Sequence, residues 1–166
     1  KNQLFLIKSM EKIFFKHRNL KLFIIGDGEL KDELREIINK LNLNNRIFLL
    51  GYKKNVFNYL KSCKCFILSS LWEDPGYVLI EAAMANATII SSNCPNGPSE
   101  ILNDGHSGYL YENNSEKDFI KKFEDFIKSS EEEIYKKKIS AKKGIKIYTN
   151  FYHYKFLEKY LSIWIK

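Results

Sequence analysis

Residues 20–51, LKLFIIGDGELKDELREIINKLNLNNRIFLLG, contain the pattern that decides the fold. An apolar run at 20–25 ends at a Gly-Asp-Gly turn, and such a short run is typical of a buried strand in a parallel sheet. A second apolar run at 47–50 also ends at a glycine. Between the two runs, apolar side chains recur at helical spacing: Leu30, Leu34, Ile37, Ile38 and Leu41. This stretch therefore predicts a strand, a helix over 29–41 and a second strand.

The same alternation continues on both sides of this stretch. A helix is expected over residues 4–15, and further helices and strands then alternate: helices at 56–60, 78–86 and 98–102, with strands at 65–69, 88–90 and 109–111. Strands that alternate with helices predict an α/β fold, a doubly wound parallel sheet with helices on both faces.

The pattern after residue 116 is wholly helical and predicts a helical C-terminal tail. The first part of this tail carries an apolar stripe, expected in the core: Phe119, Phe123, Phe126 and Ile127. A final aromatic-rich helix is expected over 151–165, and its Tyr and Phe side chains predict packing in a core or against another domain.

Length and composition indicate a globular domain. The 166 residues are enough for one packed core, and 45% are hydrophobic while 28% are charged. Apolar runs stay shorter than the roughly 20 residues that cross a bilayer. The chain opens on Lys1-Asn2-Gln3, with neither an initiator Met nor a signal peptide. We therefore expect a fragment of a longer, cytoplasmic protein.

Cysteine and histidine positions predict no structural metal. The three cysteines and three histidines show no metal-ligand spacing, and the cysteines are interpreted as reduced, buried thiols: Cys63, Cys65, Cys94, His17, His106 and His153.

The formal charge of +7 has three interpretations. Much of it comes from six lysines between residues 136 and 146, which follow three glutamates at 131–133. This order suits a solvated helix face, because it matches the helix dipole and gives i,i+4 ion pairs. Attraction to anionic lipid, and hence peripheral association with the inner face of the membrane, is the second interpretation. Nucleic acid is the third and is not expected, since no binding motif accompanies the lysines.

Ligands of an open α/β sheet bind beyond the carboxyl ends of its strands, where four loops are expected: 26–29, 51–54, 69–77 and 93–99. The third loop runs into a helix that begins near Gly76, and its N-terminal N–H groups suit a pyrophosphate. Glu81, about one turn inside this helix, is placed to accept hydrogen bonds from ribose hydroxyls. Glu73 precedes the helix and would lie near a sugar. The two carboxylates would thus bracket a nucleotide sugar.

These glutamates carry a resemblance to a known family. Glu73 and Glu81 have seven residues between them, and this E-x7-E element resembles that of retaining GT-B glycosyltransferases. The surrounding sequence is similar to glycosyltransferase family 4. Four more segments resemble that family in the same order: residues 1–8, 22–28, 48–52 and 95–110. Two positions depart from the pattern, because Asp74 and Asn86 stand where glycine is common.

The resemblance implies a role for each residue of the predicted site. Glu81 would hold the ribose hydroxyls, Glu73 would contact the donor sugar, and Lys1 would neutralise the diphosphate leaving group. Glu73 and Lys1 are therefore the catalytic candidates. The other donor-binding candidates are backbone N–H groups at the phosphates and the glycine loops beside the nucleotide: Gly76, Tyr77, Val78, Gly26, Gly28, Gly51 and Tyr52.

The resemblance also implies a reaction. A hexose or N-acetylhexosamine would pass from a UDP-sugar to a glycan or lipid-linked acceptor, with retention of configuration, in bacterial cell-envelope polysaccharide biosynthesis. The leaving group would be stabilised by lysine, an upstream arginine and the helix dipole. Because the chain has no D-x-D, neither metal nor cofactor is expected. Residues 1–166 would be a single Rossmann-like donor domain, inactive alone, that lacks its first strand and the N-terminal acceptor domain.

Alternatives stay open on the residues alone. They are a GT-B nucleotide-sugar epimerase, and a non-catalytic basic docking module for anionic lipid or nucleic acid. Glu73 would then be only a helix N-terminal acid, and residues 96–99 only a turn and helix cap. Hydride transfer is disfavoured, because Lys31 occupies the third glycine position of a dinucleotide G-x-G-x-x-G motif.

Overall fold

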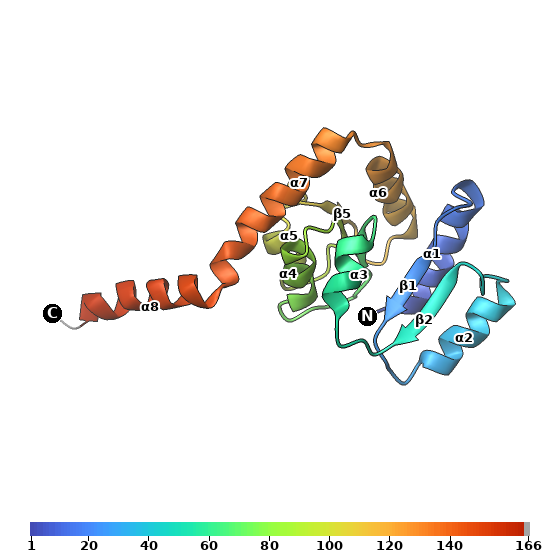
Figure 1. The fold of residues 1–166 in the computed structure, drawn as a ribbon, viewed down its shortest axis with the longest axis horizontal. Helices are drawn as coiled ribbons and strands as arrows, with labels where there is room; N and C mark the ends of the chain where they lie inside the picture. The colour runs from blue at the N-terminus through green and yellow to red at the C-terminus, as the bar shows by residue number, and fades with distance from the viewer. Residues whose placement is uncertain (165–166) are drawn as a thin grey trace.

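Helices and strands alternate through most of the computed structural model, which describes residues 1–164 (Figure 1). The elements are α1 (Gln3–Lys16), β1 (Leu22–Ile25), α2 (Lys31–Lys40), β2 (Ile47–Gly51), α3 (Val56–Ser62), β3 (Phe66–Leu68), α4 (Tyr77–Met84), β4 (Ile89–Ser92), α5 (Pro98–Ile101), β5 (Tyr109–Tyr111), α6 (Glu116–Lys128), α7 (Glu131–Gly144), the 3-10 helix η1 (Ile145–Tyr148) and α8 (Asn150–Trp164). Each predicted element is present, with its ends displaced by a few residues.

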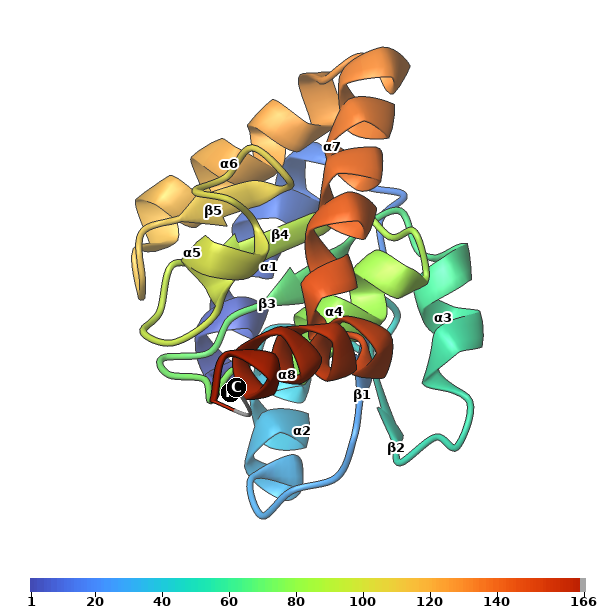
Figure 2. The ribbon, with the colours of Figure 1, turned by 90° about the vertical axis from the view of Figure 1, so that its left-hand side faces the viewer.

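The strands pair in parallel within two sheets. β1 pairs with β2, and β4 lies between β3 and β5. Two hydrophobic clusters lie on opposite sides of β3–β5. One packs against α1, α2 and α6, and the other against α3, α4, α5 and α7. Figure 2 shows β3, β4 and β5 between these groups of helices. The predicted parallel α/β fold with helices on both faces is therefore confirmed.

Strand β4 is covered by hydrophobic clusters on both faces of the sheet, so consecutive residues of this strand are apolar. Ile90 belongs to one cluster and Ile89 to the other, because successive strand side chains point to opposite faces. The strand also runs further than its apolar part predicts. Ser91 and Ser92 continue the pairing with β5, and both are fully buried.

The helical tail confirms the predicted aromatic stripe and corrects another expectation. Phe119, Phe123 and Phe126 are buried in the first cluster, and Ile127 is partly buried against it. Helix α8, by contrast, extends away from the rest of the molecule (Figure 1). Its aromatic side chains between residues 151 and 160, among them Phe151 at 66% exposure, lie outside the core. Packing of α8 against another domain stays a prediction.

The cysteine prediction is wrong at one position. Cys94 is buried and Cys65 partly so, but Cys63 is exposed, because it forms the C-terminal end of α3 at the surface. Its thiol donates a hydrogen bond to the carbonyl of Leu60. The part of the chain that the structure describes has no group of three or more side chains suited to a metal ion. Within residues 1–164, no helix is both long enough and apolar enough to span a bilayer.

Candidate functional site

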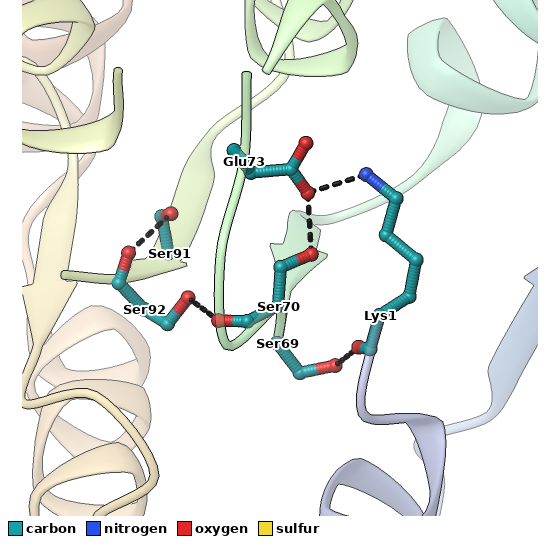
Figure 3. Close-up of polar contacts among 6 residues, drawn as sticks. All are labelled: Lys1, Ser69, Ser70, Glu73, Ser91 and Ser92. Carbon is teal, nitrogen blue, oxygen red and sulfur yellow. Dashed lines mark hydrogen bonds and ion pairs between the residues drawn. The ribbon is translucent and has the colours of Figure 1, made fainter. Parts of the chain in front are cut away.

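The loop after β3 joins the start of the chain to the centre of the site (Figure 3). β3 ends at Leu68, and the next two residues are buried serines. The Ser69 hydroxyl donates a hydrogen bond of 2.9 Å to the carbonyl of Lys1. This contact places Lys1, two residues before α1, at the carboxyl end of β3.

The Glu73 carboxylate is buried, with 5% of the residue exposed, and receives two hydrogen bonds. The Lys1 ammonium group and the Ser70 hydroxyl both donate to Oε1, the latter over 2.5 Å (Figure 3). Lys1 and Glu73 are 72 residues apart in sequence, so the fold creates this ion pair. The two predicted catalytic candidates thus lie in direct contact.

The environment of Glu73 favours its ionised form. Burial raises the pKa of the carboxyl, but hydrogen bonds from Lys1 and Ser70, and the positive charge of Lys1, outweigh that effect. The pKa of Glu73 therefore lies below its ordinary value. At neutral pH the side chain is a carboxylate that accepts hydrogen bonds, which suits it to sugar hydroxyls and not to proton donation.

Buried hydroxyl groups on the neighbouring strands β4 and β5 donate hydrogen bonds to the backbone at the end of β3. Ser92 donates a 2.7 Å hydrogen bond to the Ser70 carbonyl, whereas the Ser91 hydroxyl donates within β4, to the Ser92 carbonyl over 2.9 Å. The Tyr111 hydroxyl donates to the Leu68 carbonyl. Sequence reasoning missed these residues. The available signal was that Ser69-Ser70 and Ser91-Ser92 each follow an apolar strand run without a turn residue between.

Helix α4 begins at this site. Its N-cap is Gly76 at φ 84°, a left-handed conformation that glycine adopts without strain. Within the described residues, no side chain caps this end and no acid occupies its first turn. Because the first N–H groups of a helix lack intrahelical partners, the end carries partial positive charge beside Glu73. The predicted phosphate-facing groups of Tyr77 and Val78 belong to this first turn.

Gly97 is a site residue that the sequence did not single out. A Cβ at this position would lie 1.9 Å from the carbonyl oxygen of Pro75, so the loops around 75 and 97 touch backbone to backbone. The Glu73 N–H also donates to the carbonyl of Pro95. Pro95 and Gly97 therefore contact the loop that carries Glu73, in addition to the role of Gly97 as the N-cap of α5.

Glu81 lies on the solvent-facing side of α4. Tyr77, Glu81 and Met84 are exposed along this side, while Leu79 and Ile80 face the core. The apolar residues around Glu81 therefore pack away from it, and the carboxylate is open to a ligand.

The glycine loops after β1 and β2 lie together. The Gly26 N–H donates to the Gly51 carbonyl over 2.9 Å, and the Asp27 carboxylate accepts from the Tyr52 N–H over 2.8 Å. Gly51 has a φ of 68° and Gly26 a φ of 120°, whereas Gly28 has no positive φ. A Cβ at Gly28 would meet open space. A hydrogen bond from Lys31 and the one from Tyr52 hold the pKa of Asp27 below its ordinary value. Asp27 is a further residue that sequence reasoning missed.

The arrangement is suited to an anionic ligand that carries hydroxyl groups. A lysine ammonium group and an uncapped helix end lie beside a carboxylate that is held ionised. The cation and the helix end attract phosphates, and the carboxylates accept hydrogen bonds from hydroxyls.

Comparison with known proteins agrees with this chemistry. Residues 1–146 match the family model described as glycosyl transferases group 1. An uncharacterized glycosyltransferase of Methanocaldococcus jannaschii is 52% identical over 102 residues, which are 61% of this chain and 25% of that protein. A Campylobacter jejuni N-acetylgalactosamine-N,N'-diacetylbacillosaminyl-diphospho-undecaprenol 4-alpha-N-acetylgalactosaminyltransferase is 34% identical over 116 residues, 70% of this chain and 31% of that protein.

Solved structures share the fold. A crystal structure of a Staphylococcus aureus TarM mutant in complex with Fondaparinux, alpha-GlcNAc-glycerol and UDP superposes with a TM-score of 0.86 at 27% identity. The match covers 98% of this chain and 32% of that one. The chain spans about a quarter to a third of the curated relatives it matches. Its resemblance to glycosyltransferase family 4 is confirmed: the chain belongs to the group 1 glycosyl transferases.

Proposed function

We propose that this chain is the donor-binding domain of a retaining glycosyltransferase that uses a UDP-sugar, with a hexose or N-acetylhexosamine as the transferred sugar. The observation that carries the proposal is the buried, ion-paired Glu73 beside the uncapped N-terminus of α4. A helix end of this kind attracts a diphosphate, and a carboxylate next to it attracts the hydroxyls of the attached sugar.

Each residue has a role in this proposal. Lys1 and the backbone N–H groups of Gly76, Tyr77 and Val78 meet the diphosphate, so that charge on the leaving group is stabilised. Glu73 accepts hydrogen bonds from the donor sugar. Glu81, exposed on α4, accepts them from the ribose. The glycine loops border the nucleotide: Gly26, Gly28, Gly51 and Tyr52.

The domain organisation is part of the same proposal. Among the described residues β1 pairs only with β2 and β3 only with β4, yet strands of both sheets pack on one hydrophobic cluster. A strand that precedes residue 1 in a longer protein would fit between β1 and β3 and join the two sheets. An N-terminal domain on the same chain would supply the acceptor site and the upstream arginine.

The relatives support a UDP donor and an acceptor of the cell envelope. The TarM mutant structure contains UDP, and the C. jejuni relative is named for a diphospho-undecaprenol acceptor. We extend this to a glycan or lipid-linked acceptor reached from the cytoplasm, at the inner face of the membrane. Group 1 enzymes typically use nucleotide-sugar donors without a metal cofactor, and our proposal includes none.

Calorimetric titration of the chain with UDP, GDP and ADP tests the proposal. We expect saturable binding of UDP, and loss of at least tenfold in affinity in Glu81→Ala, because ribose hydroxyls lose a charged acceptor. Glu36→Ala is the matched control, since Glu36 is also an exposed helical glutamate, on α2. It should bind UDP like the wild type.

Two other results would count against the proposal. Binding that is equally strong in Glu81→Ala, and that weakens steeply with salt for any polyanion, would indicate a basic docking module. No binding of any nucleotide, also in a protein extended upstream of residue 1, would exclude a donor domain. An epimerase would bind UDP as well, but would convert a free UDP-sugar without an acceptor.

A further inference from the structure

We propose that Ser70 is the positioning residue for the Glu73 carboxylate: it holds Oε1 while Lys1 turns to the donor diphosphate, and so directs Oε2 to the hydroxyls of the donor sugar. This inference rests on the proposed function. Ser70 would act on the donor sugar only through Glu73, and the sugar would contact Oε2 of that carboxylate.

One oxygen of the Glu73 carboxylate accepts both hydrogen bonds. Lys1 Nζ and Ser70 Oγ each donate to Oε1 of Glu73 (Figure 3). The second oxygen, Oε2, is thereby left to accept hydrogen bonds from a ligand. A sugar offers neighbouring hydroxyl donors, which a carboxylate oxygen with free lone pairs can accept.

The two side chains that donate to Glu73 differ in how far they can move. The Lys1 side chain is 55% exposed, and a lysine ammonium on its flexible stem can change partner at low cost. Ser70 is 0% exposed, so its hydroxyl cannot move with Lys1 toward a bound diphosphate. When a diphosphate with higher negative charge arrives, Lys1 is the donor that can move to it. Ser70 then remains as the hydrogen bond that orients Glu73.

The sheet holds the backbone of Ser70 in place. Ser92 at the end of β4 donates to the Ser70 carbonyl over 2.7 Å, and Ser92 is also fully buried. Ser69, next to it, holds the backbone at Lys1. A short side chain on such a constrained backbone can place its hydroxyl with little variation, which is what a positioning group requires.

The titratable groups around Glu73 come from two segments. Lys1 supplies its side-chain ammonium group, which favours the carboxylate. Cys94, in the loop after β4, is a nearby thiol whose pKa is raised chiefly by burial. Removal of the Ser70 hydroxyl leaves all of these groups in place. It therefore raises the pKa of Glu73 by loss of one hydrogen bond alone.

Ser70→Ala is the test, with Ser91→Ala as the matched control. Ser91 is equally buried in the same sheet, and its hydroxyl donates to a backbone carbonyl instead of a carboxylate. Three measurements are made on each: the pKa of Glu73 by carboxyl carbon NMR without ligand, and calorimetric affinities for UDP and for UDP-N-acetylglucosamine, UDP-glucose and UDP-galactose. Urea unfolding confirms that each variant is folded.

We expect Ser70→Ala to raise the pKa of Glu73 and to weaken the tightest of the UDP-sugars about tenfold, the size of one charged hydrogen bond, with UDP affinity unchanged. Ser70→Thr, which keeps the hydroxyl, should restore part of this affinity. If Ser70→Ala leaves the Glu73 pKa and UDP-sugar affinity at wild-type values, or Ser91→Ala changes them equally, the role of Ser70 is refuted. If the wild type binds neither UDP nor any UDP-sugar, the proposed function fails and this inference with it.

Discussion

Gly97 lies where two loops of the candidate site meet, and its lack of a side chain is a structural requirement. A Cβ would lie 1.9 Å from the Pro75 carbonyl oxygen, and the φ of 112° is unfavourable for other residues. We expect Gly97→Ala to lower the free energy of unfolding by about 3 kcal/mol, from overpacking and backbone strain together. Urea denaturation measures this loss.

Gly28→Ala is the control for that change. Gly28 has open space around the Cβ position and no positive φ, so the substitution should alter stability by less than about 0.5 kcal/mol. If the two variants lose equal stability, the close contact between the loops does not constrain the fold.

Single residues were predictable where a pattern of types marked them. Glu73, Glu81 and Gly76 follow from a loop that runs into a helix, and Lys1 only from the family resemblance. The positions of Ser70 and Ser92 after apolar strand runs were visible in the sequence, but the group that each hydroxyl contacts was not predictable. Their role depends on contacts between β3 and β4 that only the fold creates.

Glu124 on α6 contacts the C-terminal end of α1. Its carboxylate lies 3.1 Å from His17 Nε2 and 3.7 Å from the Lys16 ammonium. Burial raises the pKa of Glu124, but the hydrogen bond and charge of His17, with Lys16, bring it below the ordinary value of 4.5. Because the folded pKa is the lower one, this stabilisation is present above about pH 4.5 and is lost as the pH falls through the folded value.

Glu124→Gln should therefore lower the free energy of unfolding by about 1 kcal/mol at neutral pH, and the difference from the wild type should shrink as the pH falls below 4.5 and through the folded pKa of Glu124. Urea denaturation across this pH range measures it. Glu112→Gln, at an exposed glutamate outside this contact, is the control. A difference that persists unchanged in acid would show that the Glu124 charge contributes nothing.

Helix α7 shows how far an element can be predicted. The order of acids before bases predicts a helix with i,i+4 pairs, and the structure has a capping box at Ser130 and Glu133 and a Lys136–Glu132 ion pair. Lys137 departs from the solvated face, because its ammonium donates to the carbonyls of Gly105 and Gly108. No charge pattern could indicate this, since the acceptors are backbone groups of a distant turn.

The division of the strands into two sheets is a property of the whole molecule. β4 is paired on both sides, whereas β1 and β3 each have one neighbour within residues 1–164. We expect amide hydrogens of β1 and β3 to exchange faster than those of β4 in this chain. In a protein extended upstream, the added strand should slow their exchange to the rate of β4. Unchanged exchange after extension would contradict the proposed six-stranded sheet.

Strand and helix order was predictable because each element has a clear period. The pairing into two sheets was not, because apolar runs mark a buried strand without naming its neighbours. The exposure of α8 to solvent was not predictable either, since its aromatic residues would suit a core as well as an interface.

A crystal structure of the chain with UDP would show whether the loop before α4 and the N-terminus of α4 form the donor site. We expect the diphosphate at the N–H groups of Tyr77 and Val78, with the Lys1 ammonium transferred to it from Glu73. The ribose hydroxyls should lie within hydrogen-bond distance of Glu81. UDP bound elsewhere, with the Lys1–Glu73 ion pair intact and Glu81 free of contact, would contradict the assignment of this loop and helix as the donor site.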